Sequence, residues 1–124
     1  PLDNLTTTID NSELLKLQKL CHEVYIEKSV RDYIINIIRA TRSHPDIKLG
    51  ASPRASLGLY HASQALAAIR GRNYVIPDDV KYLAIPVLAH RIIIKTEARL
   101  RGHSTEKIVA EIISKVPVPV EGKP

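Results

Sequence analysis

The sequence contains no Met, Trp or Phe, and five tyrosines are its only aromatic residues. A hydrophobic core must therefore be built from aliphatic side chains, and Ile, Leu and Val supply 38 of the 124 residues. This share is well above that of disordered chains, so the sequence predicts a packed core. The length is that of a single domain.

Cysteine and long apolar runs are also scarce. The single cysteine, Cys21, cannot form a disulfide within the chain and fits a reducing compartment. No apolar run approaches the roughly 18 residues of a membrane-spanning helix, and no basic segment precedes an apolar stretch as in a signal peptide. We therefore expect no membrane span and a cytoplasmic location. The missing methionine has two explanations, removal of an initiator Met before Pro1 or excision from a longer protein.

The usual signatures of an enzyme site are missing as well. Gly71, Gly102 and Gly122 are isolated, so there is no glycine-rich phosphate loop. Five scattered histidines and one cysteine lack the spacing of metal ligands, and Cys21 and His22 would diverge on a helix. We predict no metal site and no catalytic residue in this chain.

The charge is mildly basic, with a net value of +5. Such an excess suits a polyanionic partner, such as a nucleic acid or a nucleotide phosphate. An ordinary soluble domain carries a similar excess, so the charge alone does not decide between these interpretations.

Apolar residues recur at helical spacing in five segments, which predicts an all-α fold, a small bundle of about five helices. At most one or two very short strands are expected, at residues 92–94, with extended links at residues 24–26 and 74–76. Residues 46–50 and the basic residues 99–103 are predicted to be loops. Capping residues or prolines predict the five helix starts at Asn11 or Ser12, Ser29, Ser52-Pro53, Pro77, and Ser104 or Thr105.

Other residues set the helix ends and the inward faces. His44-Pro45 ends the second helix, because the residue before proline is pushed out of the α region. Gly71 ends the third helix after Arg70, as a left-handed C-terminal glycine, and Pro86 is expected to kink the fourth. The residues predicted to face the core are, helix by helix, Leu14, Leu17, Cys21 and Val24; Val30, Tyr33, Ile34, Ile37, Ile38 and Thr41; Ala55, Leu59, Ala62, Leu66 and Ile69; Val80, Leu83, Ala84, Val87 and Leu88; and Ile108, Val109, Ile112, Ile113 and Val116.

Arg54 has an unusual position on physical grounds. It is the second residue of the predicted third helix, where the partial positive charge of the helix dipole makes a cation unfavourable by about 0.3–1 kcal/mol. Free backbone N–H groups and an arginine at one helix start form an anion site, and a bound phosphate would remove the conflict. The alternative is a solvated arginine on an exposed turn.

Five stretches around Arg54 resemble one known family. They are residues 41–46 (TRSHPD), 49–55 (LGASPRA), 71–81 (GRNYVIPDDVK), 87–92 (VLAHRI) and 112–119 (IISKVPVP). In order and spacing they resemble the lid subdomain of MoxR-family AAA+ ATPases. The resemblance extends from about Ser12 to Pro119, and the string around Arg54 is its most specific part.

The resemblance implies that Arg54 is the sensor 2 arginine, which reaches the γ-phosphate of ATP with Ser52 and Pro53 beside it. ATP and Mg²⁺ would be bound by a missing AAA+ core, so the chain alone is expected neither to bind them nor to hydrolyse ATP. Expected partners are that core, neighbouring subunits of a ring and an unknown client protein. The expected domain limits are 1–10 for a linker from the core, 11–116 for the helical lid and 117–124 for an extended tail.

Two alternatives stay open from the residues. A helical nucleic-acid-binding module is suggested by the charge and by the helix-loop-helix spacing around Arg70 and Arg72, although the basic residues are spread over every segment. A structural adaptor is the other. Arg42 and His44 either support the loop that presents Arg54 or simply end a helix. His90 and Arg91 match a position of the family, but no chemistry is assigned to them.

Overall fold

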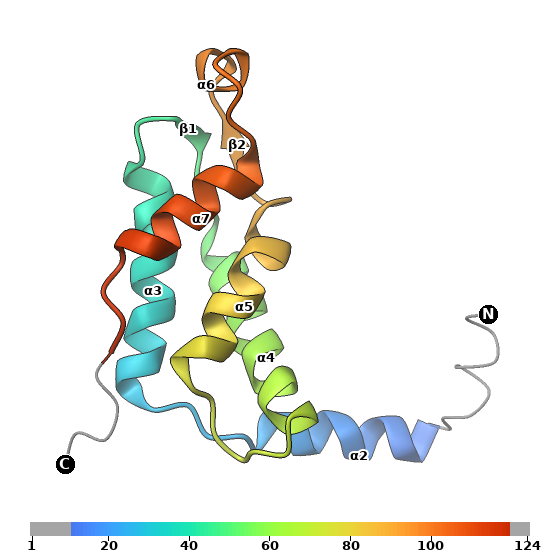
Figure 1. Cartoon of the computed structure of the whole chain (residues 1–124). Coiled ribbons are helices and arrows are strands. Elements are labelled where there is room, and N and C mark those ends of the chain that lie inside the picture. Colours follow the sequence, from blue (N-terminus) through green and yellow to red (C-terminus); the bar gives the residue numbers. More distant parts are fainter. Residues whose placement is uncertain (1–10, 120–124) are drawn as a thin grey trace.

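The computed structural model describes residues 11–119, apart from the side chains of residues 17 and 18, and within this range the chain forms six helices and two short strands (Figure 1). The expected linker at 1–10 and the last five residues of the expected tail lie outside the described residues. The helices are α2 (Asn11–His22), α3 (Lys28–Ser43), α4 (Pro53–Ile69), α5 (Pro77–Leu88), α6 (Thr96–Leu100) and α7 (Thr105–Lys115), and the strands are β1 (Ile47–Leu49) and β2 (Ile93–Ile94).

The helices form one small bundle. Helix α4 packs against α2, α3 and α5, and α7 packs across α3 and α5. Figure 1 shows α2 crossing the base of the bundle and projecting to one side, with the two strands and α6 at the opposite end. The prediction of a mostly helical bundle with very short strands is confirmed.

Helix α3 has the face that its sequence predicts. All six residues of its predicted stripe are buried, because the apolar positions follow helical spacing without interruption. Tyr33 and Ile37 lie at the centre of the core, at 1% and 0% exposure. The helix ends at Ser43, with His44 in an extended conformation before Pro45, as the proline predicts.

The predicted stripe on α4 is wrong in its second half. Ala55 and Leu59 are buried, but the buried face continues through Ser63, Gln64 and Ala67, and Ile69 is 81% exposed. The two polar residues hide this face from a hydrophobicity pattern. Gln64 is satisfied in the core because its Nε2 donates to the carbonyl oxygen of Val24 at 2.9 Å.

Parts of the two segments expected to be loops form regular secondary structure. Residues 47–49 form β1, which pairs antiparallel with β2, with Ile47 opposite Ile94. The pairing is supported by a backbone bond of 2.8 Å from Lys95 N–H to the carbonyl of Asp46. Residues 96–100 form α6, so only the end of the expected basic loop is irregular. Its turn is closed by Gly102, whose φ of +90° favours glycine.

The remaining ends mostly follow their sequence signals. Helix α4 ends in the predicted left-handed turn at Gly71, with φ of +81°. The N–H groups of Gly71 and Arg72 donate to the carbonyls of Ala68 and Ala67 at 3.0 and 2.9 Å, the pattern of a Schellman motif. Helix α5 continues through Pro86 to Leu88. Helix α2 forms as predicted. Of the residues predicted to face the core with it, Val24 is buried and Cys21 is half-buried, but Leu14 is 47% exposed, so the prediction is wrong for Leu14.

Candidate anion site at the start of helix α4

The start of α4 leaves its backbone N–H groups without a side-chain cap. Ser52 is the N-cap residue, with φ −81° and ψ 166°, but its hydroxyl makes no capping hydrogen bond. Pro53 occupies the first helical position, where its missing N–H costs nothing. Arg54 follows with an exposed side chain that has no hydrogen bond or ion pair with any residue from 11 to 119. A cation and open N–H groups therefore meet at one helix end.

The loop before α4 is fixed to helix α3 by two side chains. The N–H of Ala51 donates to Thr41 Oγ1 at 2.9 Å, and the carbonyl of Ala51 accepts from Arg42 Nε at 3.0 Å. Thr41 is fully buried and its hydroxyl donates to the carbonyl of Ile38 at 2.6 Å. Both backbone groups of Ala51 are thus satisfied by α3, so the position of the α4 start depends on α3.

Gly50 allows this close approach. A Cβ at position 50 would lie 2.8 Å from Cγ of Arg42 and 2.9 Å from its Cα. It would also lie 2.9 Å from the carbonyl oxygen of Thr41. Any larger residue would push the loop away from α3, so the glycine of the LGASPRA string is required by packing.

The structure separates Arg42 and His44, which the sequence considered together. Arg42 holds the loop that presents Arg54, as one of the two alternatives predicted. His44 lies elsewhere: its Nδ1 accepts from Asp46 N–H at 3.0 Å and its Nε2 lies 3.1 Å from Oε1 of Glu111 on α7. His44 therefore ties the end of α3 to α7 and does not support the α4 start.

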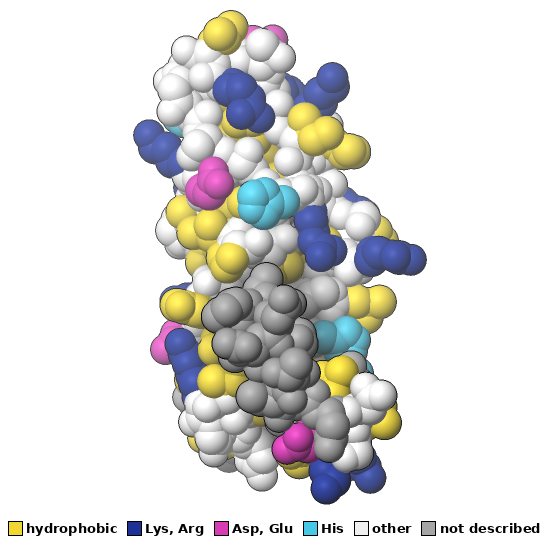
Figure 2. Space-filling model, turned by 90° about the vertical axis from the view of Figure 1, so that its right-hand side faces the viewer, with side chains coloured by type: hydrophobic (Ala, Val, Ile, Leu, Met, Phe, Trp, Pro, Cys, Tyr) yellow, Lys and Arg dark blue, Asp and Glu magenta, His cyan; other side chains and the backbone are white. Residues whose placement is uncertain are grey.

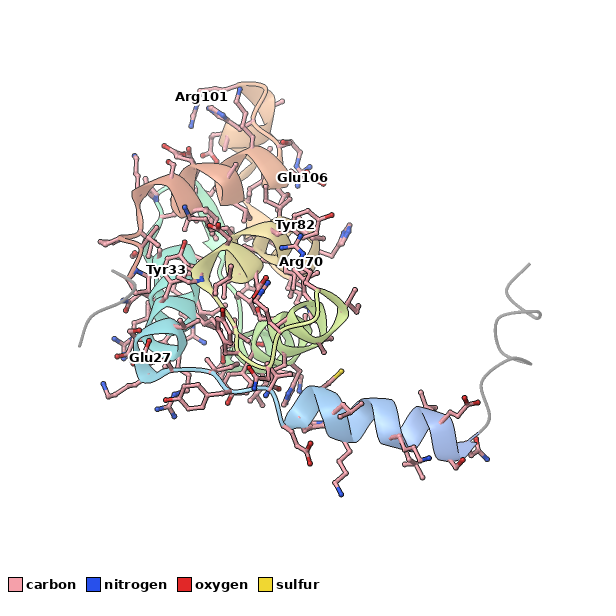
Figure 3. All side chains as sticks on the ribbon, turned by 60° about the horizontal axis from the view of Figure 1, so that its bottom comes forward. Glu27, Tyr33, Arg70, Tyr82, Arg101 and Glu106 are labelled. Atoms are coloured by element: carbon pink, nitrogen blue, oxygen red, sulfur yellow. The ribbon has the colours of Figure 1, made fainter. Side chains whose placement is uncertain are left out.

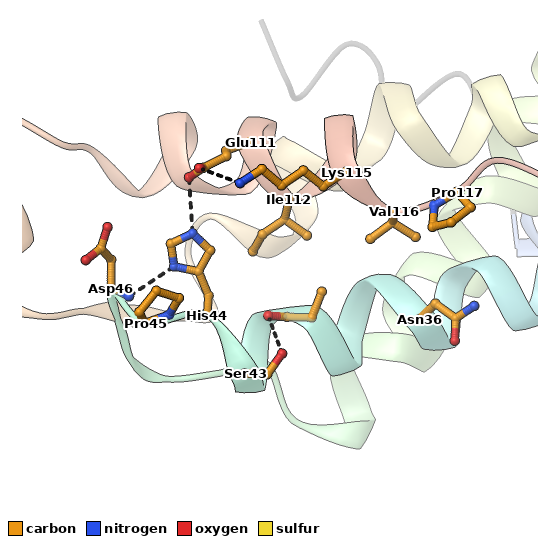
Figure 4. Close-up of a pocket in the computed structure, with 11 residues that line it drawn as sticks. Asn36, Ser43, His44, Pro45, Asp46, Glu111, Ile112, Lys115, Val116 and Pro117 are labelled. Carbon is orange, nitrogen blue, oxygen red and sulfur yellow. Dashed lines mark hydrogen bonds and ion pairs between the residues drawn. The ribbon is translucent and has the colours of Figure 1, made fainter.

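A groove of about 560 Å³ lies beside His44, between the C-terminal ends of α3 and α7 (Figure 4). Glu111 is bonded there to His44 and, at 3.2 Å, to Lys115. The hydrogen bond from His44 is the main cause that lowers the pKa of the Glu111 carboxyl, and Lys115 lowers it further. His44, Glu111 and Lys115 in this groove are paired with each other, whereas Arg54 has no side-chain partner among residues 11–119.

Arg70 and Arg72, the basic residues next to Gly71, are engaged by a buried carboxylate. Asp79 is fully buried and receives Arg72 Nη1 and Nη2 at 2.7 and 2.6 Å. Arg70 Nη1 lies 3.4 Å from Oδ1 of Asp79, and the N–H of Ile76 donates to Oδ2 of Asp79 at 3.0 Å. Burial alone would raise the pKa of Asp79, but the Arg72 hydrogen bonds, the Ile76 N–H and both positive charges outweigh it and lower the pKa.

The same network closes the start of α5. Ile76 stands at the N-cap and has no side-chain acceptor, so only the reciprocal bond from its N–H to Asp79 is made. Figure 3 shows Arg70 beside Tyr82, and the guanidinium carbon lies 5.1 Å from the ring centroid. The sequence predicted a helix start at Pro77, but not that Asp79 is buried.

Neither a metal site nor a membrane helix is found in the described part of the chain. Residues 11–119 contain no group of three His, Cys, Asp or Glu side chains placed to hold a metal ion. Over the same residues, no helix combines the length and apolarity needed to cross a bilayer.

Comparison with known proteins identifies the family. Residues 39–112, 74 of the 124, match the family model of the AAA lid domain. This region includes Thr41, Gly50 and Arg54, the residues that build and occupy the α4 start. The chain therefore belongs to the AAA lid domain family, and the resemblance to the lid of MoxR-family AAA+ ATPases is confirmed.

Individual relatives are similar over most of the chain. It is 42% identical over 121 residues to protein YeaC of Bacillus subtilis, covering 98% of the chain and 38% of that protein. It is 34% identical over 120 residues to Chaperone MoxR1 of Mycobacterium tuberculosis, covering 90% of the chain and 32% of that protein. The crystal structure of a candidate ATPase from Cytophaga hutchinsonii superposes with a TM-score of 0.83 at 33% identity. The match covers 88% of this chain and 36% of that one. The chain thus spans about a third of the length of these relatives.

Proposed function

We propose that this chain is the lid of a MoxR-type AAA+ ATPase and that Arg54 is its sensor 2 arginine. The observation that carries the proposal is the unpaired Arg54 at an uncapped helix start whose backbone is fixed by Thr41 and Arg42. The proposal is supported by the match to the AAA lid domain and by the similarity to Chaperone MoxR1 and to a candidate ATPase.

Arg54 acts on the terminal phosphate by charge. Its guanidinium remains protonated, so it donates hydrogen bonds to phosphate oxygens and stabilises the charge of phosphoryl transfer without moving a proton. Ser52 and Pro53 set the direction of the first turn, and the Ser52 hydroxyl, which makes no capping bond within residues 11–119, is available to the same anion. ATP supplies the phosphoryl group and Mg²⁺ neutralises its charge. The rest of the protein holds both, so we expect no ATP hydrolysis by this chain alone.

The connection between the α4 start and α3 gives a route from nucleotide state to lid movement. Because the backbone of Ala51 is bonded on both sides to α3, a pull on Arg54 by phosphate is transmitted to α3 and to the helices packed on it. Loss of the γ-phosphate releases that pull. We propose that this cycle, in a ring with neighbouring subunits, drives chaperone-like remodelling of a client protein.

The nucleic-acid alternative receives no support from the two arginines that suggested it or from the face shown in Figure 2. Arg70 and Arg72, the pair that suggested it, both bind Asp79. Figure 2 shows Lys and Arg side chains scattered along the visible face, where a groove-binding protein would present a stripe.

The test is ATP turnover by the full-length protein with Arg54→Ala. Loss of a charged hydrogen bond to phosphate, worth about 1.5–3 kcal/mol, predicts turnover lower by roughly 10- to 100-fold. Arg31→Ala is the matched control, because Arg31 is also an exposed arginine in the first turn of a helix, α3, and has no ion pair with the described residues. Equal turnover in the two variants would contradict the assignment.

A further inference from the structure

An exposed apolar surface lies at the end of the molecule opposite α2. Leu49 of β1 and Ile93 of β2 are register partners, and their side chains are 58% and 50% exposed. Opposed residues of an antiparallel pair have Cβ atoms about 4.5–5.5 Å apart, so these two side chains form one apolar patch. Leu100, at the end of α6, is 81% exposed at the same end of the molecule (Figure 1). Residues 46–49 and 92–103, which carry these side chains, are called the tip below.

The tip is also basic. It contains four Lys or Arg residues and two acids, so it carries +2 of the net charge of +5. Of the two acids, Asp46 binds Arg101 at 2.9 Å, and Glu97 remains. The other cations of the tip are exposed and have no ion pair with residues 11–119: Lys48, Lys95 and Arg99. Figure 2 shows basic and hydrophobic side chains next to each other at this end, an arrangement complementary to an acidic surface with apolar groups.

The exposed leucines of α2 give no such indication of a partner. Leu14, Leu15 and Leu20 lie in a segment, residues 11–23, that contains two lysines and two glutamates. That surface is apolar but has no excess of charge, so the chemistry of what covers it is not specified. The tip, by contrast, combines exposed apolar side chains with an excess of one charge.

The tip is held in place by the end of α3. The Asp46 carbonyl accepts from the Lys95 N–H at 2.8 Å, and the Asp46 carboxylate binds Arg101 Nη2. On α6, Ala98 is fully buried, and its carbonyl accepts from the N–H of His103 at 3.1 Å. A partner therefore meets a surface that is already ordered, which lowers the entropic cost of binding.

We propose that the tip docks an acidic protein segment that carries apolar side chains. The apolar side chains of this partner cover Leu49, Ile93 and Leu100, and its carboxylates face the free cations around them. A nucleic acid fits less well, because a phosphate backbone would leave the apolar patch in water. The inference goes beyond the proposed function and does not depend on the role of Arg54.

The test measures the affinity of the full-length protein, without nucleotide, for a fluorescein-labelled peptide of repeated Glu-Leu-Glu-Ser units, by fluorescence anisotropy. Leu100→Ser should weaken binding by roughly tenfold, and Lys95→Glu combined with Arg99→Glu should weaken it at least as much. A peptide with Lys in place of Glu, a peptide with Ser in place of Leu, and duplex DNA are the comparison ligands. Each of them should bind the parent protein more weakly than the acidic peptide.

Matched substitutions away from the tip control for the loss of apolar surface and for the change of charge. Leu15→Ser removes a leucine of α2 that is 65% exposed, and Arg31→Glu combined with Arg39→Glu reverses two exposed charges of α3. Both should retain the parent affinity at moderate salt, where distant charges are screened. Arg54→Ala should retain it as well, so either of the two proposals can fail while the other stands.

Other results would overturn the inference. It fails if the acidic peptide does not bind, or if the tip variants and the matched controls bind it equally well. If duplex DNA binds more tightly than the peptide, and loses affinity in the charge variant but not in Leu100→Ser, the partner is a nucleic acid and the inference is refuted. If the tip variants lower the melting temperature or break up an oligomer while peptide affinity is unchanged, the protein itself covers the tip, which also refutes the inference.

Discussion

The buried carboxylate of Asp79 offers a stability test that is independent of nucleotide. Asp79→Asn keeps the shape of the side chain but removes its charge and turns an NH₂ group toward the two arginines. Arg72 holds the carboxylate with two bonds of 2.6 and 2.7 Å, and Asp79 itself has 0% exposure. In the variant the positive guanidinium group of Arg72 therefore faces a neutral amide instead of a carboxylate.

The expected loss follows from the burial of each partner. Removing one partner of a buried ion pair costs about 3–5 kcal/mol. The side chains of Arg72 and Arg70 are 19% and 42% exposed and can turn toward water. The lower limit, about 3 kcal/mol, is therefore expected, which corresponds to a melting temperature lower by about 12 °C for a domain of this size.

The assay is urea and thermal unfolding followed by circular dichroism, with Asp78→Asn as the matched control. Asp78 is an exposed acid in the same first turn of α5, so its loss removes only a favourable dipole contact of about 0.3–1 kcal/mol. Equal destabilisation of the two variants would refute the role of the buried pair.

The pH dependence gives a second readout. The pKa of Asp79 is lowered in the folded chain, so its contribution is present above the ordinary carboxyl value near 3.9 and is lost as the pH falls through the lowered value. Acid should therefore destabilise the parent chain more than the Asp79→Asn variant. An identical acid profile for both would contradict the assignment.

Substitutions at two further positions test the α4 start and the core. Thr41→Val leaves the Ala51 N–H buried without an acceptor and should lower the free energy of unfolding in urea by about 1–3 kcal/mol. Thr41→Ser keeps the hydroxyl and should lower it less. Equal losses of stability in the two variants would refute the role of the hydroxyl. Tyr33, labelled on α3 in Figure 3, has a buried hydroxyl with no hydrogen-bond partner among residues 11–119, so Tyr33→Phe should leave stability at pH 7 equal or higher. Burial and the charge of Asp78 raise the pKa of Tyr33, so the parent should lose stability as the pH rises above about 10 and the variant should lose less; equal alkaline losses would contradict this.

The helical fold could be predicted because most helices are one-sided and have clear end signals. Helix α3 has an unbroken apolar stripe, and Pro53, Gly71 and Pro77 mark starts and ends that the structure reproduces. The strand β1 was missed because a strand of three residues with one buried side chain has no detectable period. Its order comes from pairing with β2, which is distant in the sequence.

The site was predicted only in part. The sequence identified Arg54 from its place at a helix start, and the Gly-Ala-Ser-Pro-Arg-Ala string carried the family resemblance. The roles of Thr41 and Gly50 could not be predicted, since they depend on a contact between α3 and the loop before α4.

The most direct test of the central claim is the preference of the full-length protein for ATP over ADP, measured as the ratio of the two dissociation constants. If Arg54 contacts the γ-phosphate, Arg54→Ala should reduce this preference by about tenfold or more, because ADP lacks that phosphate. Arg31→Ala should retain the parent ratio. An unchanged ratio in Arg54→Ala would contradict the proposal that Arg54 senses the terminal phosphate.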